Sequence, residues 1–177
     1  MTYETIMAGF GGQGILFAGK LMAYCGMVEE KELSWLPSYG PEMRGGTCNC
    51  HVIVSDEPIS SPFITAPDIL MAMNLPSLDK FENAVKTGGA IAYDSSLISR
   101  AVVRGDVTAV AVDATRLADE MGVGKLANMV LFGALVKSVG LCSFEILEKA
   151  LKKTIPPSKA ALLESNVKAL RAGYEAV

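Results

Sequence analysis

The sequence predicts an α/β protein in which a mostly parallel sheet is covered by helices on both faces. Short apolar runs, typical of buried strands, alternate along the chain with segments whose apolar residues recur at helical spacing. This alternation favours layers of helices packed on a parallel sheet. Half of the 177 residues are hydrophobic and only 20% are charged. Such a composition suits either a sheet with both faces covered or a surface that faces partner proteins.

The first third of the chain is predicted to contain three strands and one helix. We expect a strand at residues 5–8, a helix at 15–27, a strand at 33–36, a loop at 37–46 and a strand at 47–55. The loop contains two prolines and three glycines in ten residues, which excludes regular structure. In the last strand Cys48, Cys50, Val52 and Val54 alternate onto one face.

The rest of the chain continues the alternation and ends in helices. We expect an extended segment at 59–65, strands at 68–73, 90–93 and 107–112, a helix at 76–86, a helix ending at 120, and helices at 127–139, 143–153 and 158–174. Pro76 opens its helix at a tolerated position. We therefore expect one domain over residues 1–177, with 143–177 as its helical C-terminal part.

A glycine-rich turn follows the first predicted strand and precedes the first helix. Residues 9–14 read GFGGQG, a G-x-G-x-x-G pattern. Glycines allow a tight turn that lies close to a ligand, and the helix N-terminus offers unpaired N–H groups and a positive dipole end. The pattern predicts a Rossmann-like arrangement that binds an anionic, nucleotide-like group. The candidate residues are Gly9, Gly11, Gly12, Gln13 and Gly14.

The residues after this turn disfavour a dinucleotide as its ligand. A site for NAD or FAD needs an acidic residue about 20 positions on, at the end of the second strand, to hold the ribose hydroxyls. Glu29, Glu30 and Glu32 precede that strand, and Leu36-Pro37 occupies the place of the acid. A tight strand-to-helix turn without any ligand remains an alternative interpretation.

The loop after the second strand is the other candidate for a site. Arg44 carries a planar, permanently charged donor group between Pro41 and a glycine pair, and Glu42 can pair with it or accept a proton. Ligands in open α/β sheets collect at the carboxyl ends of strands, so we expect this loop at the same sheet edge as the glycine turn. The alternative is a rigid loop that a Glu–Arg pair holds for packing. The candidate residues are Tyr39, Gly40, Glu42 and Arg44.

Composition and motifs argue against several other functions. A net charge of −3 and a pI near 5.2 disfavour nucleic acid as a partner. No apolar run reaches the ~18 residues of a membrane helix, and no signal peptide is apparent, so we expect a cytoplasmic protein. The four cysteines are then expected to be reduced thiols.

No catalytic set or metal site is predicted for this chain. Cys48 and Cys50 form a C-x-C pair, but neither Cys25 nor Cys142 supplies a second pair, so core thiols are the favoured interpretation. His51 is the only histidine, which leaves no convincing nucleophile–histidine system.

Four segments together resemble the gamma subunit of 2-oxoacid:ferredoxin oxidoreductases. They are GFGGQGI at residues 9–15, YGPEMRGGT at 39–47, VSD with ISSP at 54–62, and PD leading to AMN at 67–74. The family acts on pyruvate, 2-oxoglutarate and branched-chain oxoacids such as ketoisovalerate. The resemblance extends to about residue 140 and is far more specific than the glycine turn alone.

The resemblance implies a division of labour among subunits. In the family the complete enzyme decarboxylates a 2-oxoacid on thiamine diphosphate, passes electrons through iron–sulfur clusters to ferredoxin and transfers the acyl group to coenzyme A. Thiamine diphosphate and magnesium belong to the alpha and beta subunits, and a ferredoxin-like delta subunit or domain often carries clusters. The gamma subunit is implicated in enclosing coenzyme A at a shared cleft.

This sequence agrees with that division, because it has neither the G-D-G…N-N thiamine motif nor the C-x-x-C-x-x-C cluster motif. We therefore expect no cofactor on the chain alone and no activity of the isolated chain. The oxoacid is selected elsewhere in the complex. The alternatives are a stand-alone nucleotide-binding oxidoreductase domain of the NAD/FAD type, a free-standing coenzyme A-binding module and an indolepyruvate oxidoreductase subunit.

Overall fold

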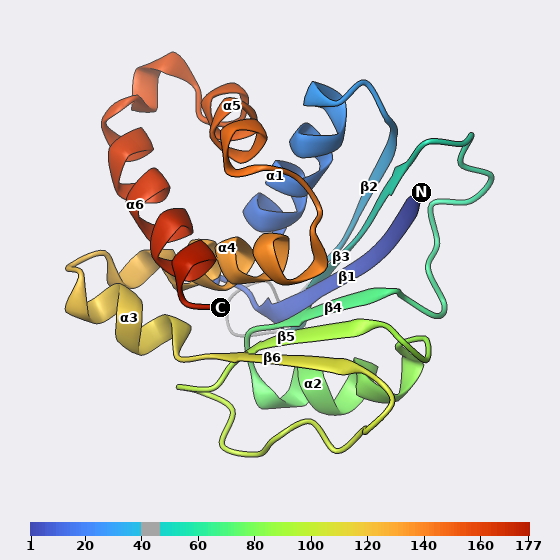
Figure 1. Ribbon diagram of the computed structural model, residues 1–177. Helices are drawn as coiled ribbons and strands as arrows, with labels where there is room; N and C mark the ends of the chain where they lie inside the picture. Colours follow the sequence, from blue (N-terminus) through green and yellow to red (C-terminus); the bar gives the residue numbers. More distant parts are fainter. Residues whose placement is uncertain (40–46) are drawn as a thin grey trace.

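Six strands form one sheet in the order β2-β3-β1-β4-β5-β6 (Figure 1). The computed structural model describes residues 1–39 and 47–177. The strands are β1 (Thr2–Phe10), β2 (Glu32–Tyr39), β3 (Thr47–Ser55), β4 (Ile69–Ala72), β5 (Ala90–Asp94) and β6 (Thr108–Val112). Each short apolar run of the sequence is one of these strands, so the α/β prediction is confirmed.

The sheet is mixed, although parallel pairings prevail. β1, β4, β5 and β6 pair in parallel, whereas β3 runs antiparallel to both β1 and β2. β3 therefore separates β2 from β1. In a dinucleotide-binding sheet β2 lies directly beside β1, so the arrangement is Rossmann-like only on the β4 side of β1.

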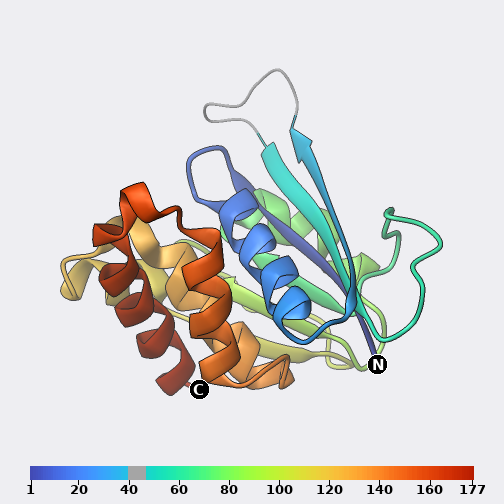
Figure 2. The same cartoon turned by 90° about the horizontal axis from the view of Figure 1, so that it is seen from above.

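Helices cover both faces of the sheet, as predicted. They are α1 (Ile15–Val28), α2 (Leu75–Phe81), α3 (Ala114–Glu120), α4 (Ala127–Val139), α5 (Phe144–Thr154) and α6 (Ala161–Glu175), with 3₁₀ turns at Glu82–Ala84, Gly124–Leu126 and Pro157–Lys159. α2 lies on one face, and α1, α4, α5 and α6 lie on the other (Figures 1 and 2). The larger hydrophobic cluster accordingly fills the α1/α4 side of the sheet and the smaller one lies beneath α2.

Several segments differ from the sequence-based expectation. β1 spans Thr2–Phe10 rather than 5–8, so Gly9 and Phe10 belong to the strand. β2 continues through Pro37 to Tyr39, because an edge strand needs hydrogen bonds on one side only and tolerates proline. Residues 59–65 form no strand. The helix expected at 76–86 ends at Phe81, and the chain continues as the 3₁₀ turn Glu82–Ala84.

The strand directions create a switch point at the carboxyl end of β1. The chain leaves β1 through α1 toward β2 and β3 on one side, whereas β4 to β6 lie on the other side. Open α/β sheets bind ligands in the crevice at such a point. The glycine turn, which follows β1, occupies this position.

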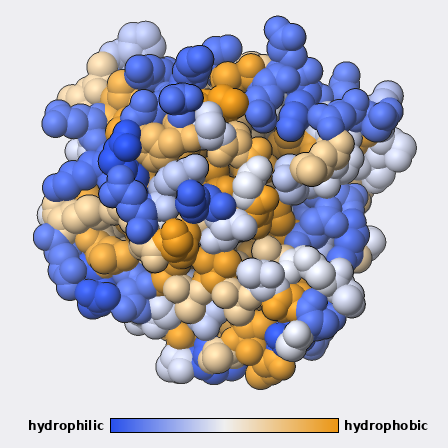
Figure 3. Space-filling view, in the orientation of Figure 1, coloured by the Kyte–Doolittle hydropathy of each residue, from blue (hydrophilic) through white to orange (hydrophobic). Residues whose placement is uncertain are grey.

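The surface carries scattered apolar residues as well as charged ones. Figure 3 shows apolar residues over the lower part of the face seen in Figure 1, where the β5–β6 loop runs. Leu97 and Val103 of that loop are 49% and 77% exposed. Within the described ranges, no helix has both the length and the apolar character to cross a membrane.

Candidate functional site

The glycine turn depends on backbone conformations that favour glycine. Gly12 and Gly14 have φ angles of 99° and 75°, and Gly14 is the N-cap of α1. Gly9 is needed for a different reason. A Cβ at Gly9 would lie 2.7 Å from Oε1 of Gln13 and 2.8 Å from Cδ1 of Ile15. The three glycines thus let the chain leave β1 and enter α1 within four residues of Phe10.

The side chain of Gln13 connects the turn to the end of β4 through hydrogen bonds. Its Oε1 accepts a hydrogen bond from the backbone N–H of Phe10 at 2.7 Å and one from Nδ2 of Asn74 at 3.3 Å. Its Nε2 donates to the carbonyl of Met73 at 3.1 Å. The oxygen of the Asn74 amide also caps α2 by accepting from the N–H of Ser77 at 2.9 Å. Gln13 therefore serves the turn itself, through contacts within the chain.

The N-terminus of α1 is well suited to an anion. Among the described residues no side chain caps it, and its first turn contains no acidic residue. The first N–H groups of an α-helix have no partner within the helix, and the helix dipole places partial positive charge there. These donors lie beside the turn, so the phosphate-binding prediction for Gly11, Gly12 and Gly14 is geometrically reasonable.

A cavity of about 260 Å³ opens at this helix end. Its lining consists of Phe10, Gly11, Gly12, Gly14, Ile15, Leu16, Phe17, Thr47 and Cys48. None of these described lining residues carries a charged side chain. An anion would therefore be held here by backbone N–H groups and the helix dipole, while the apolar walls would contact an uncharged portion of the same ligand.

The two cysteines of β3 have different environments. Cys50 is fully buried, as predicted for a core thiol, and burial raises its pKa to about 12. Cys48 packs against the larger hydrophobic cluster but is only partly buried and also lines the cavity, a position that the sequence did not predict. Partial burial still raises the pKa of Cys48.

The second predicted loop starts and ends beside the glycine turn. Tyr39, at the end of β2, pairs with Cys48, which in turn pairs with Gly9. Thr47, the first residue of β3, pairs with Phe10. The expected position of this loop at the sheet edge is thus confirmed for its two ends. Gly40, Glu42 and Arg44 lie outside the described residues, and their roles stay predictions.

Asn128 contacts the turn, a role that the sequence did not suggest. Its Nδ2 donates to the carbonyl oxygen of Gly14 at 3.1 Å, across 114 positions of sequence. Asn74 could have been suspected, since it directly follows a predicted strand and precedes Leu-Pro-Ser, a helix start. Asn128 lies within the apolar α4, and nothing in its neighbourhood indicates such a partner.

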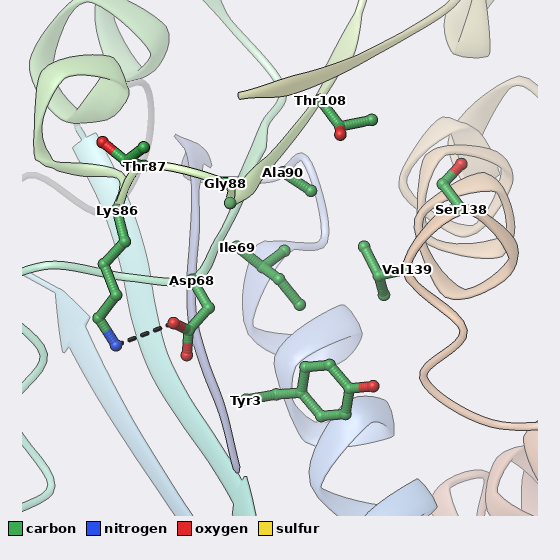
Figure 4. Close-up of a pocket in the computed structure, with 11 residues that line it drawn as sticks. Tyr3, Asp68, Ile69, Lys86, Thr87, Gly88, Ala90, Thr108, Ser138 and Val139 are labelled. Carbon is green, nitrogen blue, oxygen red and sulfur yellow. Dashed lines mark hydrogen bonds and ion pairs between the residues drawn. The ribbon is translucent and has the colours of Figure 1, made fainter. Parts of the chain in front are cut away.

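A second cavity, of about 340 Å³, lies at the opposite sheet edge, where β4, β5 and β6 begin (Figure 4). Lys86 supplies the positively charged side chain in the lining of this cavity. The Nζ atom of Lys86 pairs with Asp68 at 2.8 Å and with Glu4 at 2.5 Å. Two carboxylates thus neutralise this lysine, and the amino ends of strands are not where α/β sheets bind ligands. The glycine-turn cavity therefore remains the candidate site, as the sequence predicts.

Neither a metal site nor a histidine-based catalytic site forms in the described part of the chain. No group of three or more His, Cys, Asp or Glu side chains comes together there. Nδ1 of His51 accepts a hydrogen bond from the N–H of Ile64 at 3.0 Å, and burial lowers the pKa of His51. This histidine anchors a loop on β3.

Fold and site together define an α/β domain that presents a helix N-terminus at the switch point of its sheet. Residues 4–176 match the family described as pyruvate ferredoxin/flavodoxin oxidoreductase, and the chain belongs to that family. The resemblance found in the sequence is thereby confirmed.

Individual relatives support the same assignment. The chain is 40% identical to the ketoisovalerate oxidoreductase subunit VorA of Methanothermobacter thermautotrophicus, over 96% of this chain and 35% of VorA. It is 36% identical to the 2-oxoglutarate synthase subunit KorC of Methanocaldococcus jannaschii, over 99% of this chain and 94% of KorC. The chain thus spans about a third of the length of VorA but nearly all of KorC.

Solved structures share the fold. The gamma subunit of a keto/oxoacid ferredoxin oxidoreductase from Geobacter sulfurreducens superposes with a TM-score of 0.85 at 33% identity, over 99% of this chain and 95% of that one. A 2-oxoglutarate:ferredoxin oxidoreductase from Magnetococcus marinus, solved with 2-oxoglutarate, coenzyme A and succinyl-CoA, also gives 0.85, at 24% identity over 98% of this chain and 30% of that one. The second match is evidence of the fold alone.

Proposed function

We propose that this chain is the gamma subunit of a 2-oxoacid:ferredoxin oxidoreductase. Such a complex oxidatively decarboxylates a 2-oxoacid to an acyl-CoA and reduces ferredoxin. The observation that carries the proposal is the match over nearly the full length of both chains with KorC and with the Geobacter gamma subunit. The strand order argues against the alternative of an NAD- or FAD-binding domain, since β3 separates β2 from β1.

The chain works within a complex. The family resemblance assigns thiamine diphosphate, magnesium and the iron–sulfur clusters to alpha, beta and delta partners, and ferredoxin meets the complex rather than this chain. Among its described residues this chain brings no three His, Cys, Asp or Glu side chains together. We place the complex in a reducing cytoplasm, where the four cysteines are expected to be reduced thiols.

Within this complex the glycine-turn cavity holds an anionic portion of coenzyme A. Three features support this assignment: the uncapped N-terminus of α1, the absence of acidic residues from its first turn, and the apolar walls that would suit an uncharged arm next to a phosphate. The Magnetococcus enzyme that shares this fold was solved with coenzyme A and succinyl-CoA. Arg44 is the side chain that the sequence predicts to assist from the neighbouring loop.

Replacing Gly12 by Ala tests this site in the assembled complex. Gly12 has a φ of 99°, and no described atom lies within 4 Å of its Cβ direction, so the substitution strains the turn by about 1–2 kcal/mol without a clash among the described residues. Gly140→Ala is the matched control, because Gly140 has a φ of 64°, has the same open space and caps the far end of α4. We expect only Gly12→Ala and Arg44→Ala to raise the KM for coenzyme A.

The apolar lining supports a second candidate function, in which the turn is a contact surface for an alpha- or beta-type partner. No charged side chain occurs among the described lining residues. In that case Gly12→Ala and Arg44→Ala would reduce assembly, measured by size-exclusion chromatography. The KM for coenzyme A in the complex that still forms would then remain unchanged, which would contradict the coenzyme A assignment.

A further inference from the structure

A buried amide on α4 holds the N-cap of α1. The carbonyl oxygen of Gly14 accepts two hydrogen bonds at 3.1 Å, one from the N–H of Ala18 and one from Nδ2 of Asn128. The first is the opening hydrogen bond of the helix, and the second comes from another helix. The orientation of the Gly14 peptide is therefore fixed by α1 and α4 together.

The fit between the two residues is close. A Cβ added at Gly14 would overlap the Asn128 side-chain amide, so the amide occupies the space that any other residue at position 14 would need. Asn128 is only 4% exposed. Buried and in contact with the backbone, this side chain can hold the left-handed conformation of Gly14, from which the first turn of α1 starts.

Asn128 contacts the turn at Gly14 but does not line the described part of the cavity. It is absent from the described cavity lining, which consists of the turn, the start of α1 and the start of β3. Any effect of Asn128 on a ligand must therefore pass through the Gly14 peptide and the N–H groups that follow it. Small misplacement of such donors is enough to weaken ligand binding.

We propose that Asn128 is a positioning residue for the coenzyme A site, which holds Gly14 so that the first N–H groups of α1 face the cavity. This inference rests on the proposed function of the glycine turn. It assigns a role to a residue on α4, far in sequence from every motif of the site. Two elements then form the proposed anion-binding site: the glycine turn and the start of α4.

The chain offers a matched control for the test. Asn166 of α6 is also 4% exposed, its Nδ2 donates to the carbonyl of Leu162 at 2.7 Å, and its Oδ1 lacks a partner, as does Oδ1 of Asn128, among the described residues. Asn128→Ala and Asn166→Ala thus remove the same kind of buried amide. Of these two asparagines, Asn128 contacts the glycine turn and Asn166 contacts its own helix.

The experiment measures kcat and the KM for coenzyme A in the assembled complex, together with the Tm of each isolated chain. For Asn128→Ala we expect the KM for coenzyme A to rise about fivefold, with kcat within about twofold, whereas Asn166→Ala lowers Tm to a similar extent and leaves the KM unchanged. An unchanged KM in Asn128→Ala, or an equal rise in both variants, would overturn the inference. Gly12→Ala separates the two proposals: if it raises the KM and Asn128→Ala does not, the coenzyme A site stands without Asn128. If neither raises the KM, the proposed site itself fails.

Discussion

The side-chain amide of Asn74 joins the glycine turn to the start of α2. Its Nδ2 donates to Oε1 of Gln13 at 3.3 Å, and its Oδ1 accepts from the N–H of Ser77 at 2.9 Å. Because Gln13 also bonds to Phe10 and Met73, one pair of amides connects the ends of β1 and β4 at the switch point. Gln13, the one polar side chain of the predicted G-x-G-x-x-G turn, therefore connects this turn to the end of the neighbouring strand β4.

This pair can be tested with a double-mutant cycle. We expect Gln13→Ala and Asn74→Ala each to lower the free energy of unfolding by about 1–3 kcal/mol. Gln13→Ala removes three hydrogen bonds, and Asn74→Ala removes the bond to Gln13 together with the N-terminal cap of α2. Their effects should be less than additive, by at least about 0.5 kcal/mol, because they share a contact. Urea unfolding of the four proteins measures the coupling, and full additivity would show that the Gln13–Asn74 contact contributes nothing.

The contact between α4 and α6 depends on two glycines. A Cβ at Gly133 would overlap the carbonyl group of Leu170, and one at Gly173 would overlap that of Val130. We expect Gly173→Ala to lower the free energy of unfolding by about 1–3 kcal/mol, because overpacking outweighs the better helix propensity of alanine. Thermal unfolding measures this loss.

Gly105→Ala is the control for that substitution. No atom of the described residues lies within 4 Å of its Cβ direction, and its φ lies outside the left-handed region. The Tm of this variant should remain equal to that of the original chain or rise slightly, since alanine restricts the unfolded state. A stable Gly173→Ala variant would mean that the two helices separate at little cost.

The sequence predicted the bounds of single strands and helices better than it predicted which strands lie side by side. The strand at Thr47–Ser55 and the helix at Ala127–Val139 were predicted to the residue, because alternation and helical periodicity are local signals. Nothing local specified that β3 would lie antiparallel between β1 and β2, since strand order is decided by long-range pairing. Pro37 was misread as the start of a loop for a related reason: only an edge position makes a proline acceptable in a strand.

The candidate site shows the same limit. The glycines are readable because a positive φ requires a particular residue type, and Gly12 and Gly14 do have positive φ angles. Asn128 was not readable, because its partner is a backbone carbonyl, and any residue has one. The cavity position of Cys48 was missed because alternation along β3 indicates a face of the sheet but not where the covering helix begins.

An ion pair with one buried partner connects α2 and the following 3₁₀ turn to the loop that joins β5 and β6. The carboxylate of Glu82, whose side chain is 4% exposed, binds Nη2 of Arg100 at 2.6 Å and the N–H of Val103 at 2.6 Å. Arg100→Ala removes the guanidinium from a carboxylate that keeps its hydrogen bond to Val103, so we expect the free energy of unfolding to fall by about 1–3 kcal/mol.

Asp79 provides the comparison, because it binds the same guanidinium at 2.6 Å with a side chain that is 55% exposed. Asp79→Ala should cost no more than about 1 kcal/mol, since solvent screens this pair. Chemical denaturation of both variants measures the difference. Equal losses would show that burial of Glu82 does not make its ion pair more costly to break.

Thiol reactivity gives a direct measure of the cavity. The thiolate is the reactive form, so a raised pKa slows alkylation near neutral pH and reactivity increases as the pH approaches the pKa. Burial raises the pKa of Cys50 to about 12, and the neighbouring Cys142 together with burial raises that of Cys25. Cys48 has a raised pKa too but lines the cavity, where a reagent can reach it. With iodoacetamide at pH 8 we therefore expect Cys48 to be alkylated well before Cys50 and Cys25, as followed by peptide mass spectrometry.

Coenzyme A then provides the decisive comparison, with the chain in its assembled complex. Because the thiol of coenzyme A would itself consume iodoacetamide, the ligand is added as desulfo-coenzyme A, which has no thiol. If the ligand lies in the glycine-turn cavity, a saturating concentration slows alkylation of Cys48, and the Gly12→Ala substitution weakens this protection. Cys142, which is partly exposed and lies outside the described cavity lining, serves as the internal reference and should react at the same rate with and without the ligand. If Cys48 is already protected by assembly and coenzyme A adds nothing, the cavity is covered by a partner subunit, and the contact-surface function replaces the ligand site.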